Sequence, residues 1–226
     1  LQPRESEDAF LATLEELRAT GLPFPVVNCF VPGDLKITGP DTDMAELTAY
    51  VETVMSRAGR AGIDTIVFGS GSARRIPDGF DRTEAHAQLV AFCNMVGDRA
   101  EPAGVTIAVE PLATVDCNVL TSVGECADLV REVAHPAIRL LADTFHMMRD
   151  DDPVESVVAN GDLLRHVHVA SVPGRLPPGL DDCDFTAFFG ALERAGYDGR
   201  VSIEAKIDDP ATQLPPSLAY MRELVG

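Results

Sequence analysis

The sequence has no long apolar run and no paired cysteines, and each absence excludes a class of protein. No window approaches the roughly 18 apolar residues that a membrane-spanning helix needs. The opening LQPRESEDAF also lacks the charged-then-apolar layout of a secretion signal. The five cysteines never form a CxxC pair, which argues against a disulfide framework or a structural zinc site. We therefore expect a soluble, cytoplasmic protein with no membrane partner.

Basic residues are scarce as well. The 18 Lys and Arg face 36 Asp and Glu, giving a formal net charge of −18, and no basic cluster interleaves with aromatic residues. Such a chain repels polyanions, so nucleic acid is a poor partner. Neither an internal repeat nor a low-complexity linker is visible. With 226 residues, 46% of them hydrophobic, the chain can bury one core, and we expect a single domain over 1–226.

Short β-branched runs alternate with longer amphipathic stretches along the chain. Six runs are predicted as strands: 24–30, 63–69, 105–111, 138–144, 166–171 and 200–206. Between them, apolar residues spaced by three and four predict helices. Helix-start signals stand at Ser6, at Asp43, at Thr121 or Ser122, and at Asp184, and a last helix is expected over 215–224.

The strict alternation of strand and helix predicts an α/β fold with a parallel sheet, either open or closed into a barrel. Several strands carry one aliphatic face and one face of small or polar residues, as in VTIAVE and HVHVAS. A barrel explains this pattern, since aliphatic faces meet the outer helices and polar residues point inward. A (β/α)8 TIM barrel needs eight strands, so we expect its first strand, first helix and second strand to be missing from this chain.

Four of the predicted strands finish with a residue of the kind that binds metals: Glu110, Asp143, His168 and Glu204. Each alone is weak, because an acid at a strand end is often a helix cap or a solvated loop residue. In a barrel, however, these ends converge on one rim, where three carboxylates repel each other unless a cation or shared protons intervene. The donor set favours Mn²⁺, Mg²⁺ or Co²⁺, and Zn²⁺ is also compatible with it.

The segments VTIAVEPL, LLADTFHMM, HVHVASVPGRLPPG and VSIEAK, in this order and spacing, resemble the sugar phosphate isomerase/epimerase family of xylose-isomerase-like TIM barrels. That family includes ketose 3-epimerases, hydroxypyruvate isomerase and inositol-catabolism enzymes. The resemblance implies that Glu110, Asp143, His168 and Glu204 are the metal ligands and that His146 binds substrate beside the metal. It also suggests Arg175 as a substrate contact, although a surface arginine explains that residue equally well.

The segment after the first ligand departs from the family pattern. Ketose epimerases tend to read E-P-L-N-R-x-E-x-N, whereas this chain has Ala113 and Thr114 in place of the polar pair. Asp116 and Asn118 survive as candidate substrate contacts. A standard ketose substrate is therefore in doubt. His166 shares a strand face with His168, and we interpret it as a core residue or a support for the metal site.

These features predict an isomerase or epimerase of a sugar, polyol or keto-sugar that transfers a proton next to a carbonyl through an enediolate. Glu110 and Glu204 are the expected acid/base residues. A phosphodiester hydrolase of the endonuclease IV type is a second hypothesis, disfavoured by the few histidines and the negative charge. A third is a barrel that binds metal or sugar without turnover. No glycine-rich phosphate loop is visible, which favours an unphosphorylated substrate, and a homo-oligomer stays open.

Overall fold

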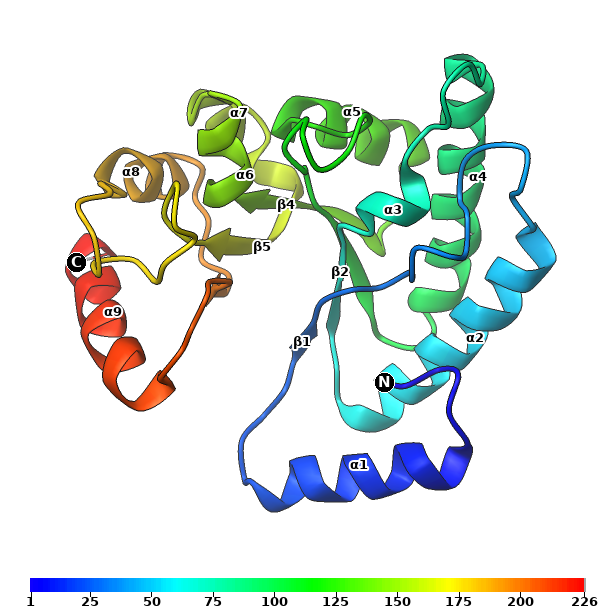
Figure 1. Ribbon diagram of the computed structural model, residues 1–226, viewed down its shortest axis with the longest axis horizontal. Coiled ribbons are helices and arrows are strands. Elements are labelled where there is room, and N and C mark those ends of the chain that lie inside the picture. Colours follow the sequence, from blue (N-terminus) through cyan, green and yellow to red (C-terminus); the bar gives the residue numbers. More distant parts are fainter. Residues whose placement is uncertain (226) are drawn as a thin grey trace. The chain divides into compact units, whose positions relative to one another are not determined.

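The computed structural model describes residues 1–225, which divide into two compact units (Figure 1). The first unit comprises Leu1–Val109, Cys117–Val119 and Leu129–Arg139, and the second comprises Glu110–Asp116, Leu120–Asp128 and the chain from Leu140 onward. Whether they form the single domain expected from sequence stays a prediction. Across residues 1–225 no helix is long and apolar enough to cross a membrane.

The first unit contains three parallel strands in sequence order: β1 (Val26–Val27), β2 (Thr65–Phe68) and β3 (Thr106–Val109). Its helices are α1 (Glu7–Ala19), α2 (Met44–Ala61), α3 (Gly71–Arg74) and α4 (Arg82–Ala100), with α2 packed beside α4 (Figure 1). The rings of Phe30, Phe68 and Phe92 form the aromatic centre of its core, with centroids 5.4 to 6.1 Å apart.

The second unit contains the pairing of β4 (Ile138–Asp143), β5 (Leu164–Val169) and β6 (Val201–Ile203), again parallel and in sequence order. Asp143 lies in register with His168, and His168 with Ser202. The helices here are α6 (Thr144–Arg149), α7 (Glu155–Ala159), the 3-10 turn η1 (Gly161–Leu163), α8 (Thr186–Arg194) and α9 (Pro210–Val225). Both β4 and α5 (Val123–Val133) run from one unit into the other.

The six expected strands are confirmed, and most helix starts follow the predicted caps. Ser6 accepts a hydrogen bond from the Ala9 N–H, and Asp43 caps α2 through the N–H groups of Ala45 and Glu46. At α5, Ser122 accepts from the Glu125 N–H while the Glu125 carboxylate accepts from the Thr121 N–H. The three upstream elements expected for a complete barrel stay a prediction.

The start of the last helix was predicted wrongly. The helix begins at Pro210, not at 215, and passes through Pro215 and Pro216. Asp209 caps it by accepting from the Ala211 N–H at 3.1 Å, and the Gln213 side-chain oxygen accepts from the N–H groups of Asp208 and Asp209. Pro210 fits the first helical position because no partner is needed for its nitrogen there.

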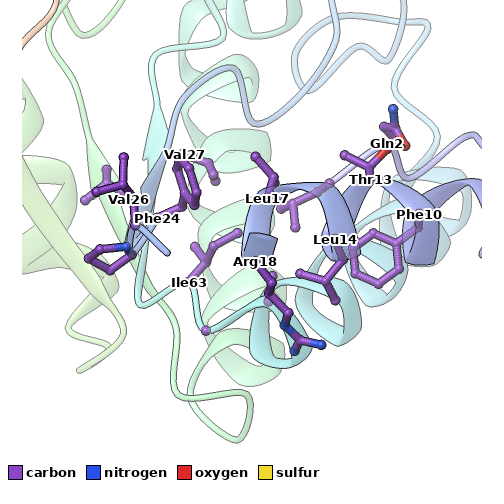
Figure 2. A pocket seen from close by; sticks show the side chains of 15 residues that line it. Gln2, Phe10, Thr13, Leu14, Leu17, Arg18, Phe24, Val26, Val27 and Ile63 are labelled. Atoms are coloured by element: carbon purple, nitrogen blue, oxygen red, sulfur yellow. Dashed lines mark hydrogen bonds between the residues drawn. The ribbon is translucent and has the colours of Figure 1, made fainter. Parts of the chain in front are cut away.

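An apolar cavity of about 360 Å³ lies between α1 and β1 in the first unit. Phe10, Leu14 and Leu17 from α1 line it together with Val27 and Ile63 (Figure 2). Exposed apolar side chains continue this surface, including Leu22 at 66% exposure and Phe24 at 39%.

The aromatic centre of the first unit predicts a large cost for removing one ring. Phe92 is 1% exposed and contacts both neighbouring phenylalanines. Phe92→Ala should lower the free energy of unfolding by about 3 to 5 kcal/mol, through lost burial and the cavity left behind. Urea denaturation measures the change. Leu22→Ala, at an exposed position, is the control and should stay within about 0.5 kcal/mol of the wild type. A Phe92→Ala effect no larger than that of the control would contradict the assigned core.

Candidate metal centre

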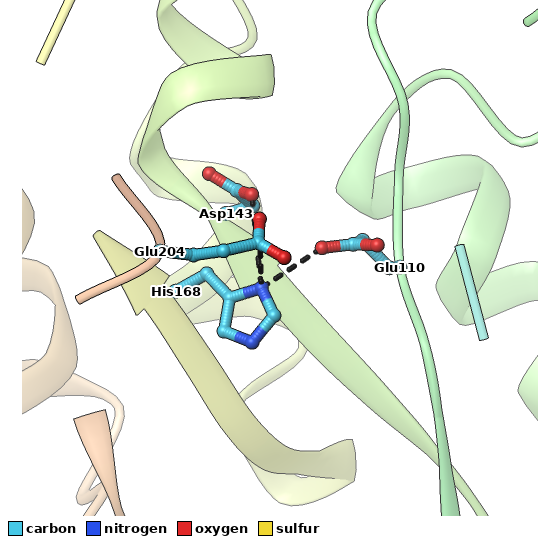
Figure 3. A group of neighbouring side chains, drawn as sticks. All are labelled: Glu110, Asp143, His168 and Glu204. Atoms are coloured by element: carbon cyan, nitrogen blue, oxygen red, sulfur yellow. Dashed lines mark hydrogen bonds and ion pairs between the residues drawn. The ribbon is translucent and has the colours of Figure 1, made fainter. Parts of the chain in front are cut away.

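Four side chains from four consecutive strand ends meet in the second unit. Glu110 follows β3, Asp143 ends β4, His168 lies near the end of β5, and Glu204 follows β6. One ligand atom from each lies within 4.8 Å of the others (Figure 3). Among residues 1–225 this is the one such group of three or more His, Cys, Asp and Glu side chains. The structure thus brings together all four residues predicted as metal ligands.

The imidazole of His168 is the centre of the group. Its Nδ1 lies 2.9 Å from Glu110 Oε1, 3.5 Å from Glu204 Oε2 and 3.8 Å from Asp143 Oδ2. Glu110 and Glu204 reach it from opposite sides in the view of Figure 3. His168 and Asp143 are each 1% exposed and Glu110 is 5% exposed, so the charges of this group are largely removed from water.

Asp143 shows that the group suits a cation. Its Oδ1 accepts a hydrogen bond from the Phe145 N–H at 2.7 Å, which caps α6. Its Oδ2 is buried and accepts no hydrogen bond from any residue in the described part of the chain. A buried carboxylate oxygen left this way is costly, and a metal ligand bond would remove the cost. Ligands about 2.1 Å from a hard ion lie up to about 4.2 Å apart, so only small movements are needed.

The charges within the group shift its pKa values strongly. Burial by itself lowers the pKa of His168, but hydrogen bonds to Glu110 and Glu204 outweigh it and raise the pKa to about 10. Burial, reinforced by the negative charge of Glu110, raises the pKa of Asp143 to about 7. Burial also opposes ionisation of Glu204, yet hydrogen bonds with His168 and Arg175 hold its pKa below the ordinary value. Without a metal, a protonated His168 therefore offsets part of the negative charge of the carboxylates at neutral pH.

His146 in α6 lies beside this group. Its Nδ1 accepts a hydrogen bond from the Ala113 N–H at 3.1 Å, and its Nε2 lies 3.9 Å from Asp143 Oδ2. Burial lowers the pKa of His146, so the ring is neutral at neutral pH. Because Nδ1 is the acceptor, the proton of the neutral ring is on Nε2. His146 thus presents a hydrogen-bond donor on the side that faces the four-residue group.

Arg175 is bound to Glu204, the fourth residue of the group. Its guanidinium pairs with the Glu204 carboxylate, and its Nε donates to the Glu204 backbone oxygen at 3.2 Å. The same guanidinium stacks over the ring of Phe145, 4.6 Å from the centroid. Arg175 is thus partly buried against Glu204, and its role as a substrate contact stays a prediction.

Asp116 is held by a residue that sequence reasoning missed. Arg149 at the end of α6 donates to Asp116 Oδ2 at 2.7 Å, and its guanidinium lies on Phe145 at 5.1 Å. The neighbouring Asp150 accepts from the backbone N–H and the hydroxyl of Thr114, at 2.6 and 3.1 Å. No sequence signal singled out Arg149 or Asp150, because a charged end of a short helix is usually solvated.

Two further residues singled out from the sequence, Asn118 and His166, do not belong to the four-residue group. Asn118 belongs to the first unit, where its amide accepts from the Ile76 N–H and donates to the Ile76 oxygen. Its role as a substrate contact stays a prediction. His166 is 1% exposed on β5, and its ring stands edge-on to that of His168, with centroids 5.1 Å apart. That agrees with a core position next to the metal group.

Comparison with known proteins identifies the family. The model of the xylose isomerase-like TIM barrel family matches residues 2–224. The chain belongs to this family. It is 33% identical over 121 residues to ketose 3-epimerase of Arthrobacter globiformis, a match covering 53% of this chain and 41% of that protein. L-ribulose 3-epimerase of Methylomonas sp. (strain DH-1) is 32% identical over 146 residues, covering 62% of this chain and 50% of that protein.

The matched segments therefore span half or less of the length of these two relatives. Among solved structures, D-psicose 3-epimerase in the presence of D-fructose superposes with a TM-score of 0.86 at 21% identity. That comparison covers 99% of this chain and 86% of the other. The fold of this xylose isomerase-like chain is accordingly an α/β fold of the TIM-barrel type.

The pKa shifts predict that metal binding depends steeply on pH. His168 and Asp143 both have raised pKa values, so their protons stabilise the metal-free fold at low pH. That contribution is lost as pH rises through about 7 for Asp143 and about 10 for His168. A metal must displace these protons, so Mn²⁺ binding should tighten from about pH 6 to about pH 8 and release about one to two protons at neutral pH.

Isothermal titration calorimetry in two buffers of different ionisation enthalpy measures the proton release. The thermal shift produced by Mn²⁺ should likewise be larger at the higher pH. Identical binding heats in the two buffers, with one affinity across this pH range, would contradict the protonated state assigned to the group.

Proposed function

We propose that this chain carries the active site of a metal-dependent isomerase or epimerase that moves a proton on the carbon next to a carbonyl group. The proposed substrate is a small sugar, polyol or keto-sugar without a phosphate group. The observation that carries the proposal is the buried cluster itself, in which two glutamates flank His168 within a group that fits one divalent cation. The similarity to ketose 3-epimerase and L-ribulose 3-epimerase supports it.

The donor set favours Mn²⁺, Mg²⁺ or Co²⁺ and is compatible with Zn²⁺, and a cation bound there would supply Lewis-acid stabilisation of negative charge on the substrate oxygens. The chain itself supplies the proton transfer. Glu110 and Glu204 each have two carboxylate oxygens, so one can face the cation while the other exchanges a carbon-bound proton. The lowered pKa of Glu204 keeps it ionised at neutral pH, which is the state that a general base requires. Removal of that proton leaves an enediolate of the sugar.

The arrangement of the glutamates favours epimerisation. Two bases on opposite sides of one carbon can remove a proton from one face and return it to the other, whereas one base alone moves a proton between adjacent carbons. Glu110 and Glu204 enter the group from different strand ends, after β3 and after β6, and we propose that they face opposite sides of the bound sugar. Arg175 fixes the orientation of Glu204 through its two contacts with that residue.

The surrounding polar residues are proposed to hold the sugar. The Nε2–H of His146 can donate to a substrate oxygen, since its Nδ1 is already occupied by the Ala113 N–H. Arg175 and Asp116 are proposed as further substrate contacts. Asp116 would contact the sugar as one half of its pair with Arg149.

Solvent-proton exchange tests the proposal directly. Metal-loaded protein incubated in D₂O with D-psicose, D-fructose or L-ribulose should introduce deuterium next to the carbonyl of at least one of them. Glu204→Gln should lower that exchange by a factor of about 10² to 10⁴, because glutamine keeps an oxygen for the metal but cannot transfer the proton. Mass spectrometry and NMR measure the label, and Glu193→Gln on the exposed side of α8 is the matched control.

Two results would count against the assignment. If Glu110→Gln and Glu204→Gln both kept wild-type exchange while metal-loaded, the carboxylates would be ligands only. If the wild type bound metal and sugar but gave no exchange with any of the sugars, the chain would be a binding protein without turnover.

The placement of His146 predicts a different phenotype. His146→Ala should leave about one metal ion per chain but weaken sugar binding or turnover about tenfold or more, because one hydrogen bond to the sugar is lost. Elemental analysis and steady-state kinetics separate the two effects. His146→Gln is a useful companion, since its side chain retains an acceptor for the Ala113 N–H. Stoichiometric loss of metal in both variants would instead make His146 a ligand.

A further inference from the structure

Thr144 joins the ends of the two central strands of the second unit. Its Oγ1 donates to the Ala170 backbone oxygen and accepts from the Ala170 N–H, both at 3.0 Å. Thr144 is 1% exposed and Ala170 is fully buried. One hydroxyl can make both bonds, because it has one hydrogen and two lone pairs.

This pair of bonds continues the sheet beyond its last rung. The pairing of β4 with β5 ends at Asp143 and His168, since the chain turns into α6 at Thr144. Ala170 then has no residue of β4 opposite it to bond its backbone groups. Buried N–H and C=O groups need partners, and the Thr144 hydroxyl takes the place of a strand neighbour for both.

The bonded residues lie one and two positions after two of the proposed ligands. Thr144 is next to Asp143, and Ala170 is two residues after His168. Asp143 is fixed a second time by the Phe145 N–H, so the backbone on its carboxyl side is held by two contacts. From this arrangement we infer that Thr144 is a positioning residue for the metal centre, setting the separation of the Asp143 and His168 ligand atoms. The inference rests on the proposed metal site.

The same link extends to the fourth ligand. Ser171, fully buried, follows Ala170, and its backbone oxygen accepts from the Arg175 N–H at 2.9 Å. The Ser171 hydroxyl accepts from the Leu176 N–H and donates to Asp181. Arg175 in turn binds Glu204. Thr144 therefore fixes the start of the loop that orients Glu204.

Two substitutions separate positioning from general stability. Thr144→Val keeps the shape of the side chain but removes both hydrogen bonds, whereas Thr144→Ser retains the hydroxyl. The matched control is Thr53→Val in α2, which loses a single exposed hydrogen bond to the Ala49 oxygen. Mn²⁺ affinity is measured by electron paramagnetic resonance of the free ion, and backbone order by hydrogen exchange of the Ala170 amide in metal-free protein.

Thr144→Val should weaken Mn²⁺ binding by about 10- to 100-fold, the usual effect of losing a residue that orients a ligand. The Ala170 amide should exchange faster in that variant. Thr144→Ser and Thr53→Val should bind Mn²⁺ within about threefold of the wild type. Denaturation in EDTA confirms that each variant is folded at the temperature of the titration.

Wild-type Mn²⁺ affinity in folded Thr144→Val, with faster Ala170 exchange, would overturn the inference while leaving the metal centre in place. If Thr144→Val does not fold, Thr144→Ser decides: a loss of more than about tenfold with Ala170 still protected would overturn it. Failure of the wild type itself to bind Mn²⁺ would instead reject the proposed metal site and the inference with it.

Discussion

The repulsion between three carboxylates around one imidazole, two of them buried and the third, Glu204, partly exposed, is the constraint on which the second unit depends. Glu110, Asp143 and Glu204 all lie within ion-pair distance of His168 Nδ1. In water such charges are screened, but in a buried site they must be balanced by a cation or by protons. The raised pKa values of His168 and Asp143 indicate that protons offset the charges without a metal, and a divalent ion is the alternative. Protons and a metal ion therefore compete for the same side chains.

The backbone around these charges lacks part of its regular hydrogen bonding. Each ligand stands at the carboxyl end of a parallel strand, where the chain leaves the sheet and backbone groups lose their ladder partners. Local side chains replace those partners: Asp143 caps α6, the Thr144 hydroxyl binds Ala170, and Ser171 binds Leu176. The polar residues around the site thus satisfy the backbone as well as one another. Because one oxygen of Asp143 bonds the backbone of α6, only its other oxygen is directed to the proposed metal site.

The strands, and the meeting of the four candidate ligand residues at one place, could be predicted from the sequence because both depend on regular features. Alternating strands and helices imply a parallel sheet, and the carboxyl ends of its strands meet at one edge. The interactions of Thr144, Phe145 and Arg149 could not be predicted, since they depend on where a six-residue helix leaves the sheet and which way its side chains point. The predicted start of α9 at residue 215 was wrong for a related reason, because Asp209 and Gln213 bond the backbone at an earlier start, Pro210.

The segment that departs from the ketose-epimerase pattern packs against α6 and the residue that follows it. Residues 113–116 are held to α6 by His146, Asp150 and Arg149 in turn, each through a polar contact. The segment that carries Ala113 and Thr114 is thus held in place by contacts within the chain. A substrate that contacts residues 113–116 must either separate Asp116 from Arg149 or bind to the intact ion pair. Separating the pair leaves a carboxylate and a guanidinium without each other as partners, which costs free energy unless other groups replace the lost hydrogen bond.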